Sequence, residues 1–91
     1  MKLVRITAVW CMSCILMNEI LNKIEAEKKT LYKTIDYDYD NDVEIIANYQ
    51  IGTILPVYIL LDAHDVELDR LVGEKSKQEL ISFLTTNGGL S

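Results

Sequence analysis

The chain has 91 residues, of which 49% are hydrophobic and 25% are charged, so residues 1–91 suit one small domain with one hydrophobic core and are neither disordered nor of low complexity. The net charge of -5 repels phosphate backbones and anionic lipid headgroups, which argues against nucleic acid and membrane surfaces as partners. No apolar run approaches the roughly 18 residues of a membrane span, and the first residues lack a secretory cleavage site, so we expect a cytoplasmic protein.

The first half of the chain predicts a strand, a helix and a second strand. Residues 2–8 are mostly apolar and β-branched, which indicates a strand at the centre of a sheet. From residue 11 to about residue 27 the apolar period becomes helical. The buried stripe of this helix is expected to contain Cys14, Leu16, Met17, Ile20, Leu21 and Ile24. Residues 31–36 alternate in polarity and predict a second strand, joined to the first by a right-handed crossover.

The second half predicts a short helix, a hairpin and a final helix. The short helix is expected to begin near Val43, to include Ile46 and Ala47 and to extend as far as Tyr49, and the apolar run at residues 57–61 indicates a strand covered on both faces. Residues 66–72 follow a turn and complete a hairpin. Ser76 and Glu79 form a capping box that begins the last helix. The predicted fold class is α/β, with the order β-α-β-α-β-β-α and a four-stranded mixed sheet.

Residues 36–42 form an acidic segment between the second strand and the short helix. Its alternating aspartates are similar to the start of a calcium loop. The pattern then fails, because Asn41 stands where that loop needs glycine and Ala47 where it needs glutamate. We therefore expect a solvated loop.

Cys11 and Cys14 are the two cysteines, and they lie where the first strand passes into the first helix. Free amide N–H groups and the positive end of the helix dipole stabilise a thiolate at a helix N-terminus, so Cys11 is the candidate nucleophile. Cys14 lies one turn further into the helix and is expected to be more buried. It is placed to attack a mixed disulfide formed at Cys11, which makes it the candidate resolving thiol.

Two other interpretations of the cysteine pair stay open at this point. Zinc normally takes four ligands, and the one remaining soft ligand is His64 in a predicted turn, so a metal site would need a second chain. Inert packing in the core suits Cys14, but it does not suit Cys11 beside Trp10 at a helix start. We expect a redox centre formed by the cysteines themselves, with no metal and no bound cofactor.

The sequence resembles the thioredoxin family in three features that come in the family's order. These are Trp10-Cys11-x-x-Cys14 after a strand, Pro56 before the next apolar strand, and Gly73 before a capped final helix. The resemblance covers nearly the whole chain and implies a thioredoxin-like fold in a minimal form, without the family's N-terminal strand and helix. It implies a thiol-disulfide oxidoreductase that reduces protein disulfides. We expect a monomer that is recharged by a thioredoxin-reductase-like protein or a low-molecular-weight thiol.

The resemblance also implies a substrate-binding surface around the cysteines. Trp10 would shield the site and pack on substrates, unless it is simply the one tryptophan of a small core. Pro56 would be a cis proline that faces the cysteine pair, although a trans bond is the ordinary expectation. Leu55 would then offer its backbone N–H and C=O to an extended peptide. Gly73 would lie beside the same groove, or would be a simple turn glycine.

Three residues depart from the family's pattern. Met12 and Ser13 stand between the cysteines, where thioredoxins usually have glycine and proline. The hydroxyl or amide of Ser13 is a candidate stabiliser of the Cys11 thiolate and Met12 adds apolar contact surface, or both are merely exposed. Arg5 stands where typical thioredoxins keep a buried acid beneath the resolving cysteine. We expect Arg5 to extend to solvent, the alternative being that its charge favours a Cys14 thiolate.

Two rival functions remain. A glutaredoxin-like protein recharged by glutathione has about this length, but Trp10, the lack of Pro-Tyr between the cysteines and the single Gly73 speak against it. The other rival is a thioredoxin-fold binding module whose cysteines no longer cycle. Arg5 is the residue that favours this second rival.

Overall fold

A computed structural model describes all 91 residues, and its elements follow the predicted order. Four strands form one mixed sheet in the order β2-β1-β3-β4. β1 is parallel to β2 and antiparallel to β3, so the first strand is central, as predicted. The elements are β1 (Lys2–Thr7), α1 (Met12–Glu27), β2 (Lys33–Asp38), α2 (Val43–Ala47), β3 (Val57–Leu61), β4 (Glu67–Val72) and α3 (Lys77–Thr86).

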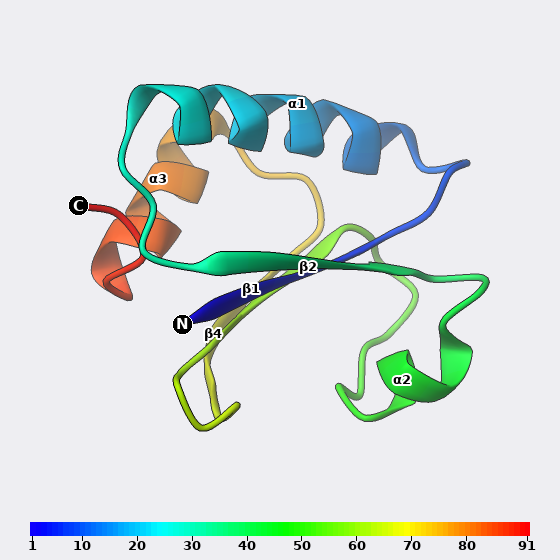
Figure 1. Cartoon of the computed structure of the whole chain (residues 1–91). Coiled ribbons are helices and arrows are strands. Elements are labelled where there is room, and N and C mark those ends of the chain that lie inside the picture. Colours follow the sequence, from blue (N-terminus) through cyan, green and yellow to red (C-terminus); the bar gives the residue numbers. More distant parts are fainter.

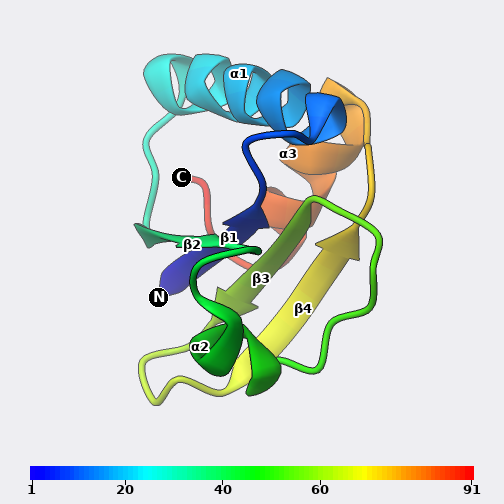
Figure 2. The same cartoon turned by 90° about the vertical axis from the view of Figure 1, so that its right-hand side faces the viewer.

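The helices lie on both faces of the sheet. In Figures 1 and 2, α1 and α3 cover one face and the short α2 lies against the other. Strand residues alternate between these faces, so each face has its own apolar cluster. On the α1 and α3 side the cluster includes Leu3, Met17, Tyr58 and Leu84. On the other side Val4, Ile59 and Ile46 cluster, and this second group extends to Ala8, Cys11, Cys14 and Leu55 at the end of the sheet.

α1 begins directly after Cys11, whose extended backbone makes it the N-cap. The buried residues Cys14, Met17, Leu21 and Ile24 recur every three or four positions and confirm the predicted stripe. Leu16 and Ile20 were expected on that stripe but lie at its edge, where Leu16 is half exposed and Ile20 only partly buried. No helix in the chain is both long and apolar enough to cross a membrane.

The second strand begins two residues later than the sequence predicts, at Lys33 instead of Leu31. The residues before it are held by the C-terminal segment, because Thr30 forms a bridge with Leu90 and the Leu31 N–H donates to the Gly89 carbonyl at 2.9 Å. The parallel register then starts with Lys2 opposite Lys33 and runs to Asp38. The alternation of polar and apolar residues begins at Leu31 and runs on past the true start of the strand at Lys33. The sequence pattern alone therefore predicts a start that is too early.

The β3–β4 hairpin and the capped final helix are confirmed. Every residue of β3 is buried, as expected for a strand covered on both faces. In the turn, the Asp62 carboxylate accepts the N–H groups of Val66 and His64, and these bonds lower the pKa of Asp62. Before α3, Ser76 and Glu79 make both hydrogen bonds of the capping box.

Candidate active site

The cysteine pair lies at the N-terminus of α1. The Cys11 N–H donates to the Ala8 carbonyl at 3.1 Å, which closes the loop after β1. The Cys14 N–H donates to Cys11 Sγ at 3.2 Å. Both cysteines are free thiols, and Cys14 is 1% exposed against 8% for Cys11, so the predicted difference in burial is confirmed.

The two sulfur atoms have different electrostatic surroundings. Burial, and then the hydrogen bond with Cys11, raise the pKa of Cys14 to about 12. Cys14 is therefore a protonated thiol at neutral pH. The Cys11 sulfur instead accepts a backbone N–H at the positive end of a helix, where negative charge is favoured. The Cys11 sulfur thus accepts a backbone hydrogen bond at the helix terminus, whereas the Cys14 thiol is held neutral by burial.

Trp10 lies on the surface beside Cys11. Its side chain is 61% exposed, so the alternative of a core tryptophan is wrong. The indole Nε1 donates to Asp40 Oδ2 at 2.7 Å, and its ring meets Tyr39 edge to face with centroids 6.3 Å apart. The acidic loop is thus more than a solvated connection, because it orients Trp10. Sequence reasoning did not find Asp40, which is 30 residues away from Trp10 along the chain.

Ser13 binds a residue from the far end of the chain. Its hydroxyl donates to Glu74 Oε1 at 2.9 Å. The expectation that Ser13 stabilises the Cys11 sulfur is therefore wrong in this structure, and the Cys14 amide is the group that does so. Met12 is exposed, which agrees both with a contact surface and with simple exposure, so its role stays a prediction. No sequence pattern pointed to Glu74, since the contact depends on how the segment after β4 packs against α1.

The Leu55–Pro56 peptide bond is cis, as the resemblance implies. Both residues are buried, and Leu55 belongs to the apolar cluster that contains Cys11 and Cys14. The backbone N–H and C=O of Leu55 have no hydrogen-bond partner in the chain. Buried backbone groups are normally paired, so the unpaired Leu55 peptide unit is a candidate to pair with an incoming backbone.

Gly73 lies next to Pro56, because its N–H donates to the Pro56 carbonyl at 2.9 Å. Its φ of +86° lies in the region that glycine adopts without strain. A Cβ at this position would meet Ile54 Cγ2 at 3.2 Å. Gly73 is therefore a turn glycine that also closely approaches Ile54 and lies beside Pro56, and its place beside a substrate groove stays a prediction.

Arg5 does not extend to solvent, and that expectation is wrong. Its guanidinium forms a bidentate ion pair with Asp36, in which Nε donates to Oδ1 at 2.6 Å and Nη2 donates to Oδ2 at 3.0 Å. The Arg5 side chain is 14% exposed. The strand register causes this, because Asp36 lies directly opposite on β2 and Tyr58 opposite on β3. The Asp36 carboxylate compensates the charge of Arg5 beneath α1.

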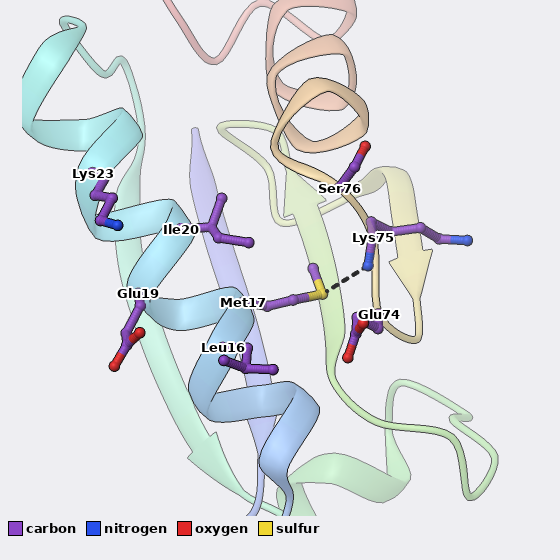
Figure 3. A pocket seen from close by; sticks show the side chains of 8 residues that line it. All are labelled: Leu16, Met17, Glu19, Ile20, Lys23, Glu74, Lys75 and Ser76. Atoms are coloured by element: carbon purple, nitrogen blue, oxygen red, sulfur yellow. Dashed lines mark hydrogen bonds between the residues drawn. The ribbon is translucent and has the colours of Figure 1, made fainter.

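A groove of about 520 Å³ runs between α1 and the segment that joins β4 to α3. Figure 3 shows Leu16, Met17 and Ile20 on one wall and Glu74 to Ser76 on the other. The walls are joined where the Lys75 N–H donates to Met17 Sδ at 3.1 Å. Leu16 and Ile20 therefore line this groove. Because Glu74 also binds Ser13, the groove begins beside the cysteine pair.

Exposed apolar side chains border the cysteines. Val9 and Trp10 precede Cys11, Met12 follows it, and Ile54 precedes Leu55; all four are well exposed. Such side chains gathered around a reactive group are typical of a surface that contacts other proteins. Sequence reasoning found Trp10 and Met12 but missed Val9 and Ile54, because loop residues follow no apolar period.

Comparison with known proteins gives consistent results. The sequence model of a family described as Thioredoxin matches residues 1–86. Thioredoxins of Mycobacterium bovis and Mycobacterium tuberculosis are each 30% identical over 83 residues, which cover 91% of this chain and 70% of theirs.

Two solved structures share the fold. A reduced Schistosoma mansoni thioredoxin pre-protein superimposes with a TM-score of 0.75 at 18% identity, over 93% of this chain and 76% of that one. A structure described as a malarial protein has a TM-score of 0.76 at 19% identity, over 96% of this chain and 98% of the other. The sheet order and helix placement described above are therefore those of a thioredoxin-like fold.

Proposed function

The chain belongs to the thioredoxin family, and from that premise we propose that it reduces protein disulfides by dithiol exchange through Cys11 and Cys14. Family and fold together support a thiol-disulfide oxidoreductase in general. The observation that carries the specific proposal is the hydrogen bond from the Cys14 N–H to Cys11 Sγ at the start of α1, with the Cys14 sulfur buried behind it.

The first step is attack by the Cys11 thiolate on one sulfur of a substrate disulfide. A bond forms between Cys11 and that sulfur, the substrate S–S bond breaks, and the second substrate sulfur leaves as a thiolate that takes up a proton. The product of this step is a mixed disulfide. The Cys14 N–H donates to the Cys11 sulfur, which places a hydrogen-bond donor at the atom where this step needs negative charge.

In the second step Cys14 loses its proton and attacks the Cys11 sulfur. The Cys11–Cys14 bond forms, and the remaining substrate sulfur leaves and is protonated. Two electrons have then passed to the substrate, which ends as a dithiol, while the pair ends as a disulfide. The raised pKa of Cys14 keeps this thiol neutral in the reduced protein.

The substrate is held as an extended backbone across the cis proline. Leu55 offers a free N–H and C=O, and an extended peptide satisfies both by strand addition. Trp10 and Met12 contribute exposed apolar surface on the cysteine side, and Gly73 leaves room beside Pro56.

The oxidised pair must be reduced again for a second turnover. A partner reductase or a low-molecular-weight thiol supplies the two electrons, and the cysteines need no bound cofactor because they are themselves the redox centre. A chain with this role works as a monomer in a reducing compartment such as the cytoplasm, where free thiols are maintained.

The test uses a peptide with one internal disulfide and the variant Cys14→Ser. The variant should accumulate a mixed disulfide between Cys11 and the peptide that dithiothreitol releases, while wild type with dithiothreitol reduces the peptide catalytically. Cys11→Ser should do neither. Peptide binding without any disulfide exchange in wild type would identify a binding module, and turnover that requires glutathione would identify the glutaredoxin-like alternative.

A further inference from the structure

Two carboxylates flank the cysteine pair and are held there by neutral donors. Trp10 Nε1 donates to Asp40 Oδ2 at 2.7 Å, and Ser13 Oγ donates to Glu74 Oε1 at 2.9 Å. Trp10 is the residue before Cys11, and Ser13 is the residue before Cys14. Each carboxylate is therefore fixed to a direct neighbour of one of the two sulfurs.

Asp40 and Glu74 approach the site from opposite sides. Asp40 follows β2 and Glu74 follows β4, and these are the two edge strands of the sheet. Figure 2 shows the segments after both strands at the end of the sheet where α1 begins. A backbone that lies across the Leu55 peptide unit would thus pass between two negative charges.

Neither carboxylate has a cationic partner within the chain. The four ion pairs join Lys2 to Asp65, Arg5 to Asp36, Arg70 to Glu67 and Lys77 to Glu27. Lys75 follows Glu74 and lines the same groove, but it forms no ion pair with Glu74. The charges of Asp40 and Glu74 are therefore available to a partner.

A second observation points to the occupant of this surface. The N–H and C=O of buried Leu55 have no partner within the chain, and an incoming extended backbone can satisfy both groups at once. An extended peptide paired there directs alternate side chains outwards on both sides of its cysteine. Cationic side chains at those positions would meet the unpaired carboxylates.

We propose that Asp40 and Glu74 select substrates in which Lys or Arg flanks the disulfide. This inference rests on the proposed disulfide reductase function and names its substrate class. Each contact is a partly exposed ion pair, so one carboxylate should change kcat/KM by roughly two- to five-fold. The effect should appear mainly in KM, because the contacts are remote from the reacting sulfur atoms and act equally before and during exchange.

The experiment measures kcat/KM for three peptides that share one internal disulfide and carry Lys, Glu or Ser on either side of it. Wild type should prefer the Lys peptide over the Glu peptide, and 0.5 M salt should reduce the preference through screening. Glu74→Gln and Asp40→Asn keep an acceptor for Ser13 and Trp10 but remove the charge, so each should weaken the preference. Glu74→Lys should shift it towards the Glu peptide.

Glu27→Gln is the control, since Glu27 lies at the other end of α1, about 20 Å from Cys14 by helix rise and further from Cys11. It should leave the preference unchanged. Equal rates for all three peptides in wild type, or a preference that Glu74→Gln and Asp40→Asn do not weaken, would overturn the inference while leaving the reductase intact. No turnover of any peptide would instead remove the proposed function on which the inference rests.

Discussion

The Cys14 N–H donates to Cys11 Sγ at 3.2 Å, so the two residues are linked through a backbone amide before any bond joins their sulfurs. The same geometry puts Cys11 at the N-cap of α1 and Cys14 inside its first turn. The Cys11 sulfur accepts a hydrogen bond at a helix terminus, whereas Cys14 is the more deeply buried residue, with 1% of it exposed against 8% of Cys11. This asymmetry underlies the different roles that we assign to them.

Selective alkylation follows from this asymmetry. With reduced protein at pH 7 and limiting iodoacetamide, Cys11 should be labelled well before Cys14, because Cys14 is more buried and its pKa is raised to about 12. Peptide mass spectrometry reports the two sites separately. In guanidinium the two thiols should react alike, and equal labelling in the folded protein would contradict the assignment of roles.

The raised pKa of Cys14 also predicts a loss of stability in alkali. The pKa rises from an ordinary value of 9.0 to about 12 on folding, so between these values the folded chain holds a proton that the unfolded chain has released. The stabilisation that the protonated Cys14 thiol provides is fully present below about pH 9. The free energy of unfolding then falls as the pH rises towards 12.

Urea unfolding of wild type and Cys14→Ala at pH 7.5 and pH 10.5 measures this effect. Wild type should lose more stability between the two pH values than the variant does. Tyr32 and Tyr58, whose pKa values burial also raises, are present in both proteins and cancel in the comparison. Identical losses would mean that Cys14 does not titrate abnormally.

Gly73 should be the least replaceable of the glycines around the site. Gly73→Ala forces a side chain into a φ of +86° and brings its Cβ to 3.2 Å from Ile54, which should cost about 1–2 kcal/mol in the free energy of unfolding. Gly52→Ala is the control, because nothing lies within 4 Å of its added Cβ. Thermal or urea unfolding that ranked the two variants alike would contradict this account.

The Arg5–Asp36 ion pair should contribute more to the free energy of unfolding than an ordinary exposed ion pair does. Asp36→Ala leaves a guanidinium that is 14% exposed without its partner, and we expect a loss of about 1 kcal/mol. Asp65→Asn breaks the exposed Lys2–Asp65 pair at a positive φ that asparagine tolerates, and it should leave stability nearly unchanged. If urea unfolding showed the same loss of free energy of unfolding for Asp36→Ala and Asp65→Asn, the partly buried Arg5–Asp36 pair would be no stronger than an exposed pair.

The order of elements could be predicted from sequence because each element carries its own local pattern. Each pattern depends only on residues that are close together in the sequence. The patterns are the buried stripe of α1, the apolar run of β3 and the capping box of Ser76 and Glu79. Lys33, the true start of β2, was missed because the preceding residues are held by the C-terminal segment, which no local pattern encodes.

The candidate site was predictable only in part, for the same reason. The cysteines and Pro56 stand in recognisable motifs, and the structure places Leu55 in the same apolar cluster as both sulfurs. The bonds from Trp10 to Asp40 and from Ser13 to Glu74 join residues 30 and 61 positions apart. Contacts between residues so far apart in the sequence depend on the packed structure. The same holds for the Arg5–Asp36 ion pair, since the sequence alone predicts that Arg5 extends to solvent.

The most direct test of the account is the reduction potential of the Cys11–Cys14 pair. The protein is equilibrated in defined dithiol buffers, Trp10 fluorescence is followed, and alkylation with mass spectrometry counts the free thiols. We predict a reversible two-electron transition to an intramolecular disulfide, at about -270 mV as for a reductant. A potential near about -120 mV would instead mark an oxidant, and the absence of a reversible intramolecular disulfide would contradict the account altogether.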